Sequence, residues 1–171
     1  CNCAGKTTAS FTVLPEILNC NEFVNADEIA KGLSPFQPEK VGIEAGRLML
    51  SRINNLLEKG EDFAFETTLA TKSYKNLILK AQKLGYHVTT LLFFYLQSPE
   101  LAVERVRKRV NEEGHYIPKD VILRRYSRGL KTVFDIYFDI VDDWIFSNNS
   151  EDRSQIIAYK LNEELEIEQP L

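Results

Sequence analysis

The start of the chain carries residue types that can bind a phosphate. Its first eight residues read Cys-Asn-Cys-Ala-Gly-Lys-Thr-Thr. Gly5-Lys6-Thr7 matches the end of the phosphate-binding loop pattern G-x-x-x-x-G-K-[ST], whose first glycine would fall one position before Cys1. In such a loop, backbone N–H groups of residues 2–7 surround a phosphate, Lys6 reaches the β- and γ-phosphates, and the Thr7 hydroxyl holds Mg²⁺. The alternative is a glycine turn that begins a helix and leaves the lysine solvated.

Two carboxylates follow segments that we expect to be short strands. Asp27 closes the run Asn25-Ala26-Asp27, and Glu66 opens the run Glu66-Thr67-Thr68. Ligands of open α/β sheets bind at the carboxyl ends of strands, so both carboxylates should reach the same crevice as Lys6. Asp27 could accept the proton of a hydroxyl that attacks a γ-phosphate, while Glu66 could orient that hydroxyl or hold Mg²⁺ through water, and Thr67 could donate a hydrogen bond. The structural alternatives are a helix N-cap at Asp27 and a strand-end capping group at Glu66.

Basic residues cluster in two segments later in the chain. They are Arg105, Arg107, Lys108 and Arg109, then Arg124, Arg125 and Arg128. Two basic helices on either side of the polar connector at 113–118 would suit a lid that closes over a triphosphate and offsets the charge that develops during transfer. A solvated helix face is the alternative, and we expect only two or three of these residues to contact ligand. His115 has no metal-ligand partner at a useful spacing, so we interpret it as a loop residue.

Strand-like and helix-like segments alternate along the chain, which indicates an α/β fold with a mostly parallel sheet. We expect helices over 5–14, 38–59, 73–84, 98–112 and 119–141, and strands over 22–26, 62–66, 88–96, 143–148 and 155–161. The last two strands could pair with each other. The strand over 88–96 has no polar alternation, so both of its faces should be covered, as in the centre of a parallel sheet. A phosphate-binding loop also follows a strand, which we expect upstream of Cys1.

The composition fits one globular domain over 1–171. Of the 171 residues, 44% are hydrophobic and 27% charged, which excludes a disordered chain and a small disulfide scaffold. A net charge of −4 argues against a nucleic-acid partner, and the longest apolar run, Leu91 to Leu96, is too short to cross a membrane. Three cysteines without regular spacing fit a reducing, cytoplasmic location. The acidic end at 162–171 should fray.

These motifs resemble, in their order along the chain, those of the zeta-toxin family of P-loop proteins, and more narrowly the chromosomal proteins known as predicted ABC-type ATPases. The resemblance rests on Asn2, Ala4-Gly5-Lys6-Thr7-Thr8-Ala9-Ser10, Asn25-Ala26-Asp27, Ala45-Gly46-Arg47, Phe65-Glu66-Thr67-Thr68, Gly114-His115, Ile117-Pro118 and Arg124-Arg125-Tyr126. It implies a three-layer P-loop NTPase fold of the nucleoside-kinase type. Cys3 departs from the family, which usually has glycine there, and a side chain at that position would crowd a tight loop.

The resemblance also implies an activity and a set of site residues. ATP would be the phosphoryl donor, Mg²⁺ the metal and a hydroxyl on a small molecule the acceptor, which in the toxins is a UDP-activated amino sugar. An antitoxin protein would be the partner. The nucleotide site would comprise Asn2, Cys3, Ala4, Gly5, Lys6, Thr7 and Thr8, with Thr7 on the magnesium. Asp27 would be the general base, Glu66 and Thr67 would contact substrate, and Arg109, Arg124 and Arg125 would clamp phosphates. The second hypothesis is a catalytically weak ATP-binding module that acts through a partner protein.

Overall fold

The chain folds into two compact units, which are described separately. The computed structural model describes residues 4–16, 19–87, 91–111, 116–151 and 153–168. Lys6–Thr67 and Glu113–Tyr116 form one unit, called here the N-terminal unit. Cys1–Gly5, Thr68–Glu112 and Ile117–Leu171 form the other, called here the C-terminal unit.

The N-terminal unit combines two short parallel strands with three α-helices. Its elements are α1 (Lys6–Glu16), β1 (Phe23–Val24), α2 (Ala26–Leu33), the 3₁₀ turn η1 (Pro38–Val41), α3 (Gly42–Lys59) and β2 (Ala64–Phe65). Val24 lies opposite Phe65 in the parallel pair, and the Glu66 N–H donates to the Val24 carbonyl at 3.1 Å. Because parallel strands end at the same edge, the residues after them, Asn25 and Glu66, emerge side by side.

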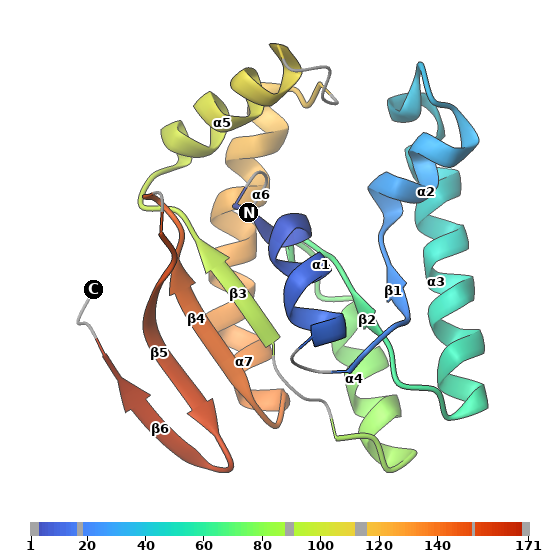
Figure 1. Ribbon diagram of the computed structural model, residues 1–171, viewed down its shortest axis with the longest axis vertical. Coiled ribbons are helices and arrows are strands. Elements are labelled where there is room, and N and C mark those ends of the chain that lie inside the picture. The colour runs from blue at the N-terminus through green and yellow to red at the C-terminus, as the bar shows by residue number, and fades with distance from the viewer. Residues whose placement is uncertain (1–3, 17–18, 88–90, 112–115, 152, 169–171) are drawn as a thin grey trace. The chain divides into compact units, whose positions relative to one another are not determined.

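Helix α3 supplies most of the core of this unit. Its buried side chains recur at helical spacing and are Ala45, Met49, Ile53, Leu56 and Leu57. α3 lies alongside α2, whose Ala30 is also buried (Figure 1). The helix ends where Gly60 adopts a left-handed conformation with φ of 71° and its N–H bonds to the carbonyls of Leu56 and Leu57. The helix predicted over 38–59 is therefore confirmed from Gly42 onward, after the 3₁₀ turn η1, whereas α2 was considered only in the alternative that Asp27 caps a helix.

The C-terminal unit is built on a mixed four-stranded sheet. Its strands β3 (Leu91–Tyr95), β4 (Trp144–Asn148), β5 (Gln155–Leu161) and β6 (Glu164–Ile167) lie in that order across the sheet (Figure 1). β3 and β4 are parallel, while β5 is antiparallel to both β4 and β6. The expected pairing of the segments at 143–148 and 155–161 is thus confirmed. The parallel pairings are β1–β2 and β3–β4, and the other described pairings are antiparallel.

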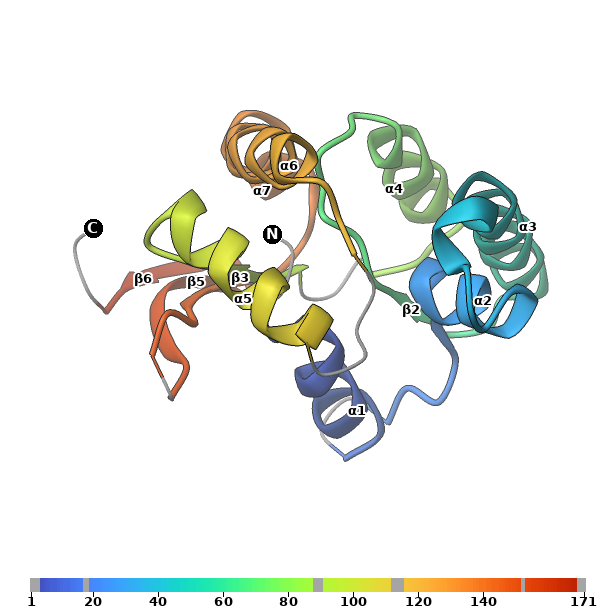
Figure 2. The ribbon, with the colours of Figure 1, turned by 90° about the horizontal axis from the view of Figure 1, so that it is seen from above.

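Strand β3 is covered on both faces, as its apolar run predicts. Phe93 enters a core with Tyr137 and Phe146, whereas the neighbouring Phe94 and Leu96 pack against a second core. The helices that supply these cores are α4 (Tyr74–Lys83), α5 (Pro99–Asn111) and α6 (Lys119–Thr132), followed by the π-helical segment η2 (Val133–Tyr137) and α7 (Phe138–Ile140). Figure 2 shows α6 and α7 against one side of this sheet. Among the described residues β3 pairs with β4 alone, so its central position stays a prediction.

One sequence-based expectation for this unit is confirmed with a local difference, and one was wrong. The chain is helical from Lys119 to Ile140, as expected over 119–141, but the segment Val133–Tyr137 is π-helical. The acidic end does not fray throughout, because Glu164–Ile167 forms β6. A two-residue turn with positive φ at Asn162 (51°) and Glu163 (70°) brings β6 back along β5. The alternating Leu165 and Ile167 supply the strand pattern that the surrounding glutamates concealed.

Among the helices of the described ranges, none combines the length and apolar character needed to cross a membrane.

Candidate functional site

The end of the phosphate-binding loop pattern has the backbone that the motif requires. Gly5 has φ of +81°, a conformation that side chains disfavour, and a Cβ added there would lie 2.4 Å from the Asn149 amide nitrogen. That amide donates a hydrogen bond of 2.7 Å to the carbonyl of Ala4, which is fully buried. The loop end is therefore anchored within the C-terminal unit by a residue that follows β4 directly, and a side chain at position 5 would strain the backbone and displace the Asn149 amide.

Glu66 joins the two chemically active residues that follow Gly5. The Lys6 ammonium lies 3.3 Å from Glu66 Oε1, and the Thr7 hydroxyl donates to Glu66 Oε2 at 2.6 Å. The Lys6 and Glu66 side chains are only 15% and 13% exposed, so water screens the ion pair weakly. This pair and hydrogen bond bring the first turn of α1 to the carboxyl end of β2 within one unit. The expectation that Glu66 lies near Lys6 is met by direct contact.

Asn25 links Glu66 to the segment that carries Asp27. Its amide nitrogen donates to Glu66 Oε2 at 3.0 Å, and its amide oxygen accepts from the Asp27 N–H at 2.8 Å. Asn25 is 7% exposed, so both ends of the amide are satisfied inside the protein. It is also the N-cap of α2, with extended φ and ψ of −132° and 119°. The alternative in which Asp27 caps this helix is wrong: Asp27 lies in the first turn with an exposed side chain.

The chemistry of this group suits a phosphate and a hard cation. Lys6 supplies a positive charge, and the positive end of α1 begins at the same residue. The Thr7 hydroxyl and a Glu66 carboxylate oxygen, 2.6 Å apart, form an all-oxygen donor set of the kind Mg²⁺ prefers. A threonine oxygen can bind Mg²⁺ while its proton still bonds to the carboxylate. The residues present therefore fit Mg²⁺ beside the phosphates of a nucleotide.

The structure describes some of the other residues considered in the sequence analysis and not others. Thr8 is exposed in the first turn of α1, and Thr67 is half-buried next to Glu66. Asn2, Cys3 and His115 lie outside the described residues.

The predicted arginines belong to the C-terminal unit. Arg109 lies on α5 and Arg124 and Arg125 lie on α6, and the two helices pack together through Ala102, Val106 and Ile122. Arg124 is exposed and Arg125 half-buried. The Arg109 Nε atom is buried and has no hydrogen-bond partner among the described residues, which is unusual for a guanidinium.

Arg105 has a structural role that the sequence did not indicate. Its two terminal nitrogens donate to the carbonyls of Asn149 and Ser150 at 2.7 and 2.8 Å. The guanidinium thus holds the segment after β4, where Asn149 in turn binds Ala4. Neither Arg105 nor Asn149 could be assigned this role from the sequence, because their partners lie far away along the chain. The only local signal is that Asn149 follows a strand.

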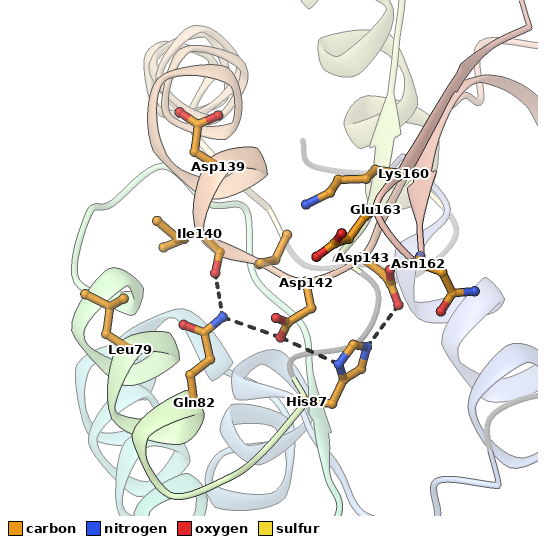
Figure 3. A pocket seen from close by; sticks show the side chains of 11 residues that line it. Leu79, Gln82, His87, Asp139, Ile140, Asp142, Asp143, Lys160, Asn162 and Glu163 are labelled. Carbon is orange, nitrogen blue, oxygen red and sulfur yellow. Dashed lines mark hydrogen bonds and ion pairs between the residues drawn. The ribbon is translucent and has the colours of Figure 1, made fainter.

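A second cluster of charged groups lies in the C-terminal unit where β4 begins (Figure 3). It lines an open pocket of about 570 Å³, a volume that would hold a small molecule. The pocket brings together Asp139, Asp142, Asp143 and Glu163 against Lys160 and His87. Carboxylates outnumber the cations here, so a nucleotide phosphate would be repelled. Size alone therefore does not identify the nucleotide site.

Hydrogen bonds show what this second cluster does in the structure. His87 Nε2 lies 3.0 Å from Asp143 Oδ2, and the Asn162 N–H donates to Asp143 Oδ1 at 2.9 Å. Gln82 donates to the Ile140 carbonyl at 2.7 Å. The hydrogen bond from His87 lowers the pKa of the Asp143 carboxyl most strongly; burial opposes it, and the Asn162 N–H adds to the lowering. Asp143 therefore connects three segments, which we call the Asp143 latch.

Comparisons with known proteins identify the family and the fold. The family model "Zeta toxin" matches residues 22–160. An uncharacterised protein of Haemophilus influenzae is 27% identical over 103 residues, which cover 60% of this chain and 73% of that protein. A solved chain from the PezAT chromosomal toxin–antitoxin system of Streptococcus pneumoniae superimposes with a TM-score of 0.65 at 19% identity, over 91% of this chain and 67% of that one.

The structural match shows the α/β fold of the P-loop NTPase type, and the family match spans most of the chain, including Asn25, Asp27 and Glu66. This chain belongs to the zeta toxin family.

Proposed function

We propose that this chain is an ATP-dependent phosphotransferase that moves the γ-phosphate of ATP to a hydroxyl group of a small molecule, with a UDP-amino sugar as the acceptor. Zeta toxins are kinase-like, which supports this class of reaction. The observation that carries the proposal is the convergence of Lys6, Thr7 and Asn25 on Glu66. It joins the lysine that would bind phosphate, the hydroxyl that would bind Mg²⁺ and a strand-end carboxylate in one place.

Nucleotide binding would draw on the first turn of α1. Backbone N–H groups of Asn2, Cys3, Ala4, Gly5, Lys6, Thr7 and Thr8 would surround the phosphates. The Lys6 ammonium would leave Glu66 for the β- and γ-phosphates, and Thr7 would hold Mg²⁺. When bound, Mg²⁺ would neutralise charge on the β- and γ-phosphate oxygens. Glu66, released from Lys6, would then accept a hydrogen bond from the acceptor molecule, beside Thr67.

Asp27 would act as the general base for the transfer step. Its exposed carboxylate would take the proton of the acceptor hydroxyl as that oxygen forms a bond to the γ-phosphorus. The bond between the γ-phosphorus and the bridging oxygen would break, and its electron pair would leave on ADP. Asn25 would hold the Asp27 backbone in place through the 2.8 Å hydrogen bond to the Asp27 N–H.

Arginines would balance the charge that develops on the transferred group. Arg109, Arg124 and Arg125 are the candidates, and Arg109 has the strongest support because its buried Nε has no hydrogen-bond partner among the described residues. A phosphate oxygen would supply that partner.

Three further properties are part of the proposal, and only the last of them comes from the family resemblance. The two compact units would form a single P-loop domain, the protein would work in the cytoplasm, and an antitoxin protein would restrain it. The last point is supported by the toxin–antitoxin system from which the similar structure comes.

A second candidate function is a nucleotide-binding module that hydrolyses little ATP and acts through a partner protein. The observation that favours it is Cys3, which stands where the family usually has glycine. A side chain there would weaken the loop by about 1 kcal/mol if its φ is positive. Such a module would bind ATP but would not depend on Asp27.

Transfer of labelled γ-phosphate from ATP to a UDP-amino sugar tests the proposal. Asp27→Asn should lower turnover by about 10²–10⁴-fold, as expected for loss of a general base, while the affinity for Mg²⁺-ATP is kept. Asp62→Asn is the matched control, because Asp62 is an exposed aspartate of the same unit that lies before β2. Equal turnover of the wild type and Asp27→Asn would refute the role of Asp27. Binding of ATP by a wild type that transfers no phosphate would favour the module.

A further inference from the structure

Strand β6 forms one end of the sheet in the C-terminal unit. Among the described residues it pairs with β5 alone, and Figure 1 places it at the outer edge of the sheet. All of its residues are exposed. An edge strand of this kind carries backbone N–H and C=O groups that a further strand can bind.

The register decides which backbone groups of β6 face outward. Leu161 lies opposite Glu164 next to the two-residue turn, and the Glu168 N–H donates to the Ile157 carbonyl at 2.8 Å. In an antiparallel pair the hydrogen-bonded residues alternate, so the glutamates at 164, 166 and 168 bond toward β5. The backbone groups of Leu165 and Ile167 therefore point away from β5, toward the open edge.

The side chains of β6 form two faces of opposite character. Leu165 and Ile167 share one face and are 61% and 68% exposed. Glu164, Glu166 and Glu168 share the other, where they surround Tyr159 of β5. The Tyr159 hydroxyl donates to Glu166, and the three carboxylates together with partial burial raise the pKa of Tyr159 to about 12, with the Glu166 hydrogen bond as the largest cause. One face of the edge is thus apolar and the other strongly negative.

We propose that β6 is a docking edge for an extended segment of a partner protein in which basic residues alternate with apolar ones. The segment would add a strand to the sheet, placing its lysines or arginines beside the three glutamates and its apolar side chains beside Leu165 and Ile167. A second copy of this chain fits poorly, because self-pairing would bring two sets of glutamates onto one face. Charge complementarity therefore selects the basic partner.

A short acetylated peptide in which lysine alternates with valine is the probe. It should bind the full chain in fluorescence anisotropy, with an affinity that falls as salt increases. A peptide of the same composition with its lysines in one block, and a peptide that alternates glutamate with valine, should bind at least about tenfold more weakly. Two further alternating peptides carry N-methyl groups, one on every odd residue and the other on every even residue. Only one of these sets of N–H groups can face β6, so one peptide should bind and the other should not.

Variants of β6 link this binding to the proposed edge. Combined Glu164→Gln, Glu166→Gln and Glu168→Gln should lower peptide affinity at least about tenfold. Combined Glu100→Gln, Glu104→Gln and Glu151→Gln, at exposed sites off β6, should not. Leu165→Pro should abolish binding, because it removes an outward N–H and keeps the bonds to β5. Unchanged circular dichroism and Tm would establish that these variants fold.

Three results would overturn the proposal. The first is equal binding of the alternating and blocked peptides, and the second is binding that persists in Leu165→Pro. The third is a wild-type dimer in sedimentation that Leu165→Pro dissociates, since the occupant of the edge would then be a second copy of the chain.

Discussion

Glu66 and Asp143 each accept hydrogen bonds at one end of a strand, but they have partners of different kinds. Glu66, after β2, binds the ammonium of Lys6 and the hydroxyl of Thr7, groups that a phosphate and Mg²⁺ can take over. Asp143, before β4, binds the His87 ring and the Asn162 backbone N–H, which hold segments of the fold. In the proposed function, the partners of a carboxylate, more than its burial, distinguish the ligand site at Glu66 from the structural latch at Asp143.

The largest difference in turnover between variants of Glu66 and variants of Asp143 should come from Glu66→Gln. The neutral amide keeps the shape but loses the ion pair with Lys6 and the charge that would orient the acceptor hydroxyl. We expect turnover to fall about 10²-fold, with a loss of about 1–3 kcal/mol in the free energy of unfolding because Lys6 loses its weakly screened partner. Steady-state kinetics and urea denaturation on one protein preparation measure both. Unchanged turnover would mean that Glu66 is a structural carboxylate like Asp143.

Asp143→Asn should lower stability and leave turnover unchanged. Loss of the carboxylate weakens the bonds to His87 and Asn162, so we expect Tm at pH 7 to fall by about 3–6 °C with turnover unchanged. The folded-state pKa of Asp143 is lowered, so its stabilising contribution is present above the unfolded pKa of about 3.9 and is lost as pH falls through the folded value. The difference in stability between wild type and variant should therefore shrink in acid. A constant difference from pH 7 to pH 2 would argue against the latch.

Asn25 has two contacts, the N-cap of α2 and the hydrogen bond to Glu66, whose contributions can be measured separately. Asn25→Ala removes the N-cap of α2 and the donor to Glu66, and should cost about 1–2 kcal/mol of stability. Asn25→Asp keeps the cap but places a second carboxylate beside Glu66. We expect it to retain more stability than the alanine variant while losing turnover to a similar degree. Equal losses of stability in both variants would mean that Asn25 stabilises the protein only through its hydrogen bond to Glu66, and not as the N-cap of α2.

The smallest effect should come from the turn beside the Asp143 latch. Glu163 has φ of 70° in the hairpin turn, a conformation that glycine adopts without strain. Glu163→Gly should therefore stabilise the protein by about 0.4–1 kcal/mol in urea denaturation, with turnover unchanged. Glu151→Gly, in a loop where no positive φ is required, is the control and should not stabilise.

The sequence predicted which residues come together better than it predicted the contacts that hold them. Lys6 and Thr7 could be recognised because the loop motif is local, and Glu66 could be placed near them because parallel strands end at one edge. Asn149 and Arg105 could not be recognised, because their contacts depend on how distant segments pack.

The fold shows the same division. Long amphipathic α3 and apolar β3 were predicted, since a single repeating pattern specifies each. The short helix α2 entered only as an alternative, with its cap placed at Asp27 instead of Asn25. The π-helical segment in the predicted 119–141 helix and strand β6 were not predicted, because packing and a turn with positive φ decide them. In β6 the three glutamates led to the expectation of a frayed end, although Leu165 and Ile167 alternate as in a strand.

Calorimetric titration of the wild type and Lys6→Ala with Mg²⁺-ATP tests most directly whether the partners of Glu66 are groups that a nucleotide takes over. We expect the wild type to bind with a Kd in the micromolar range and Lys6→Ala to bind about 10–100-fold more weakly, as expected for loss of a charged hydrogen bond. Lys31→Ala, which removes an exposed lysine of the same unit, should bind like the wild type. Equal affinity of the wild type and Lys6→Ala, or no binding by either, would contradict a nucleotide site at Glu66.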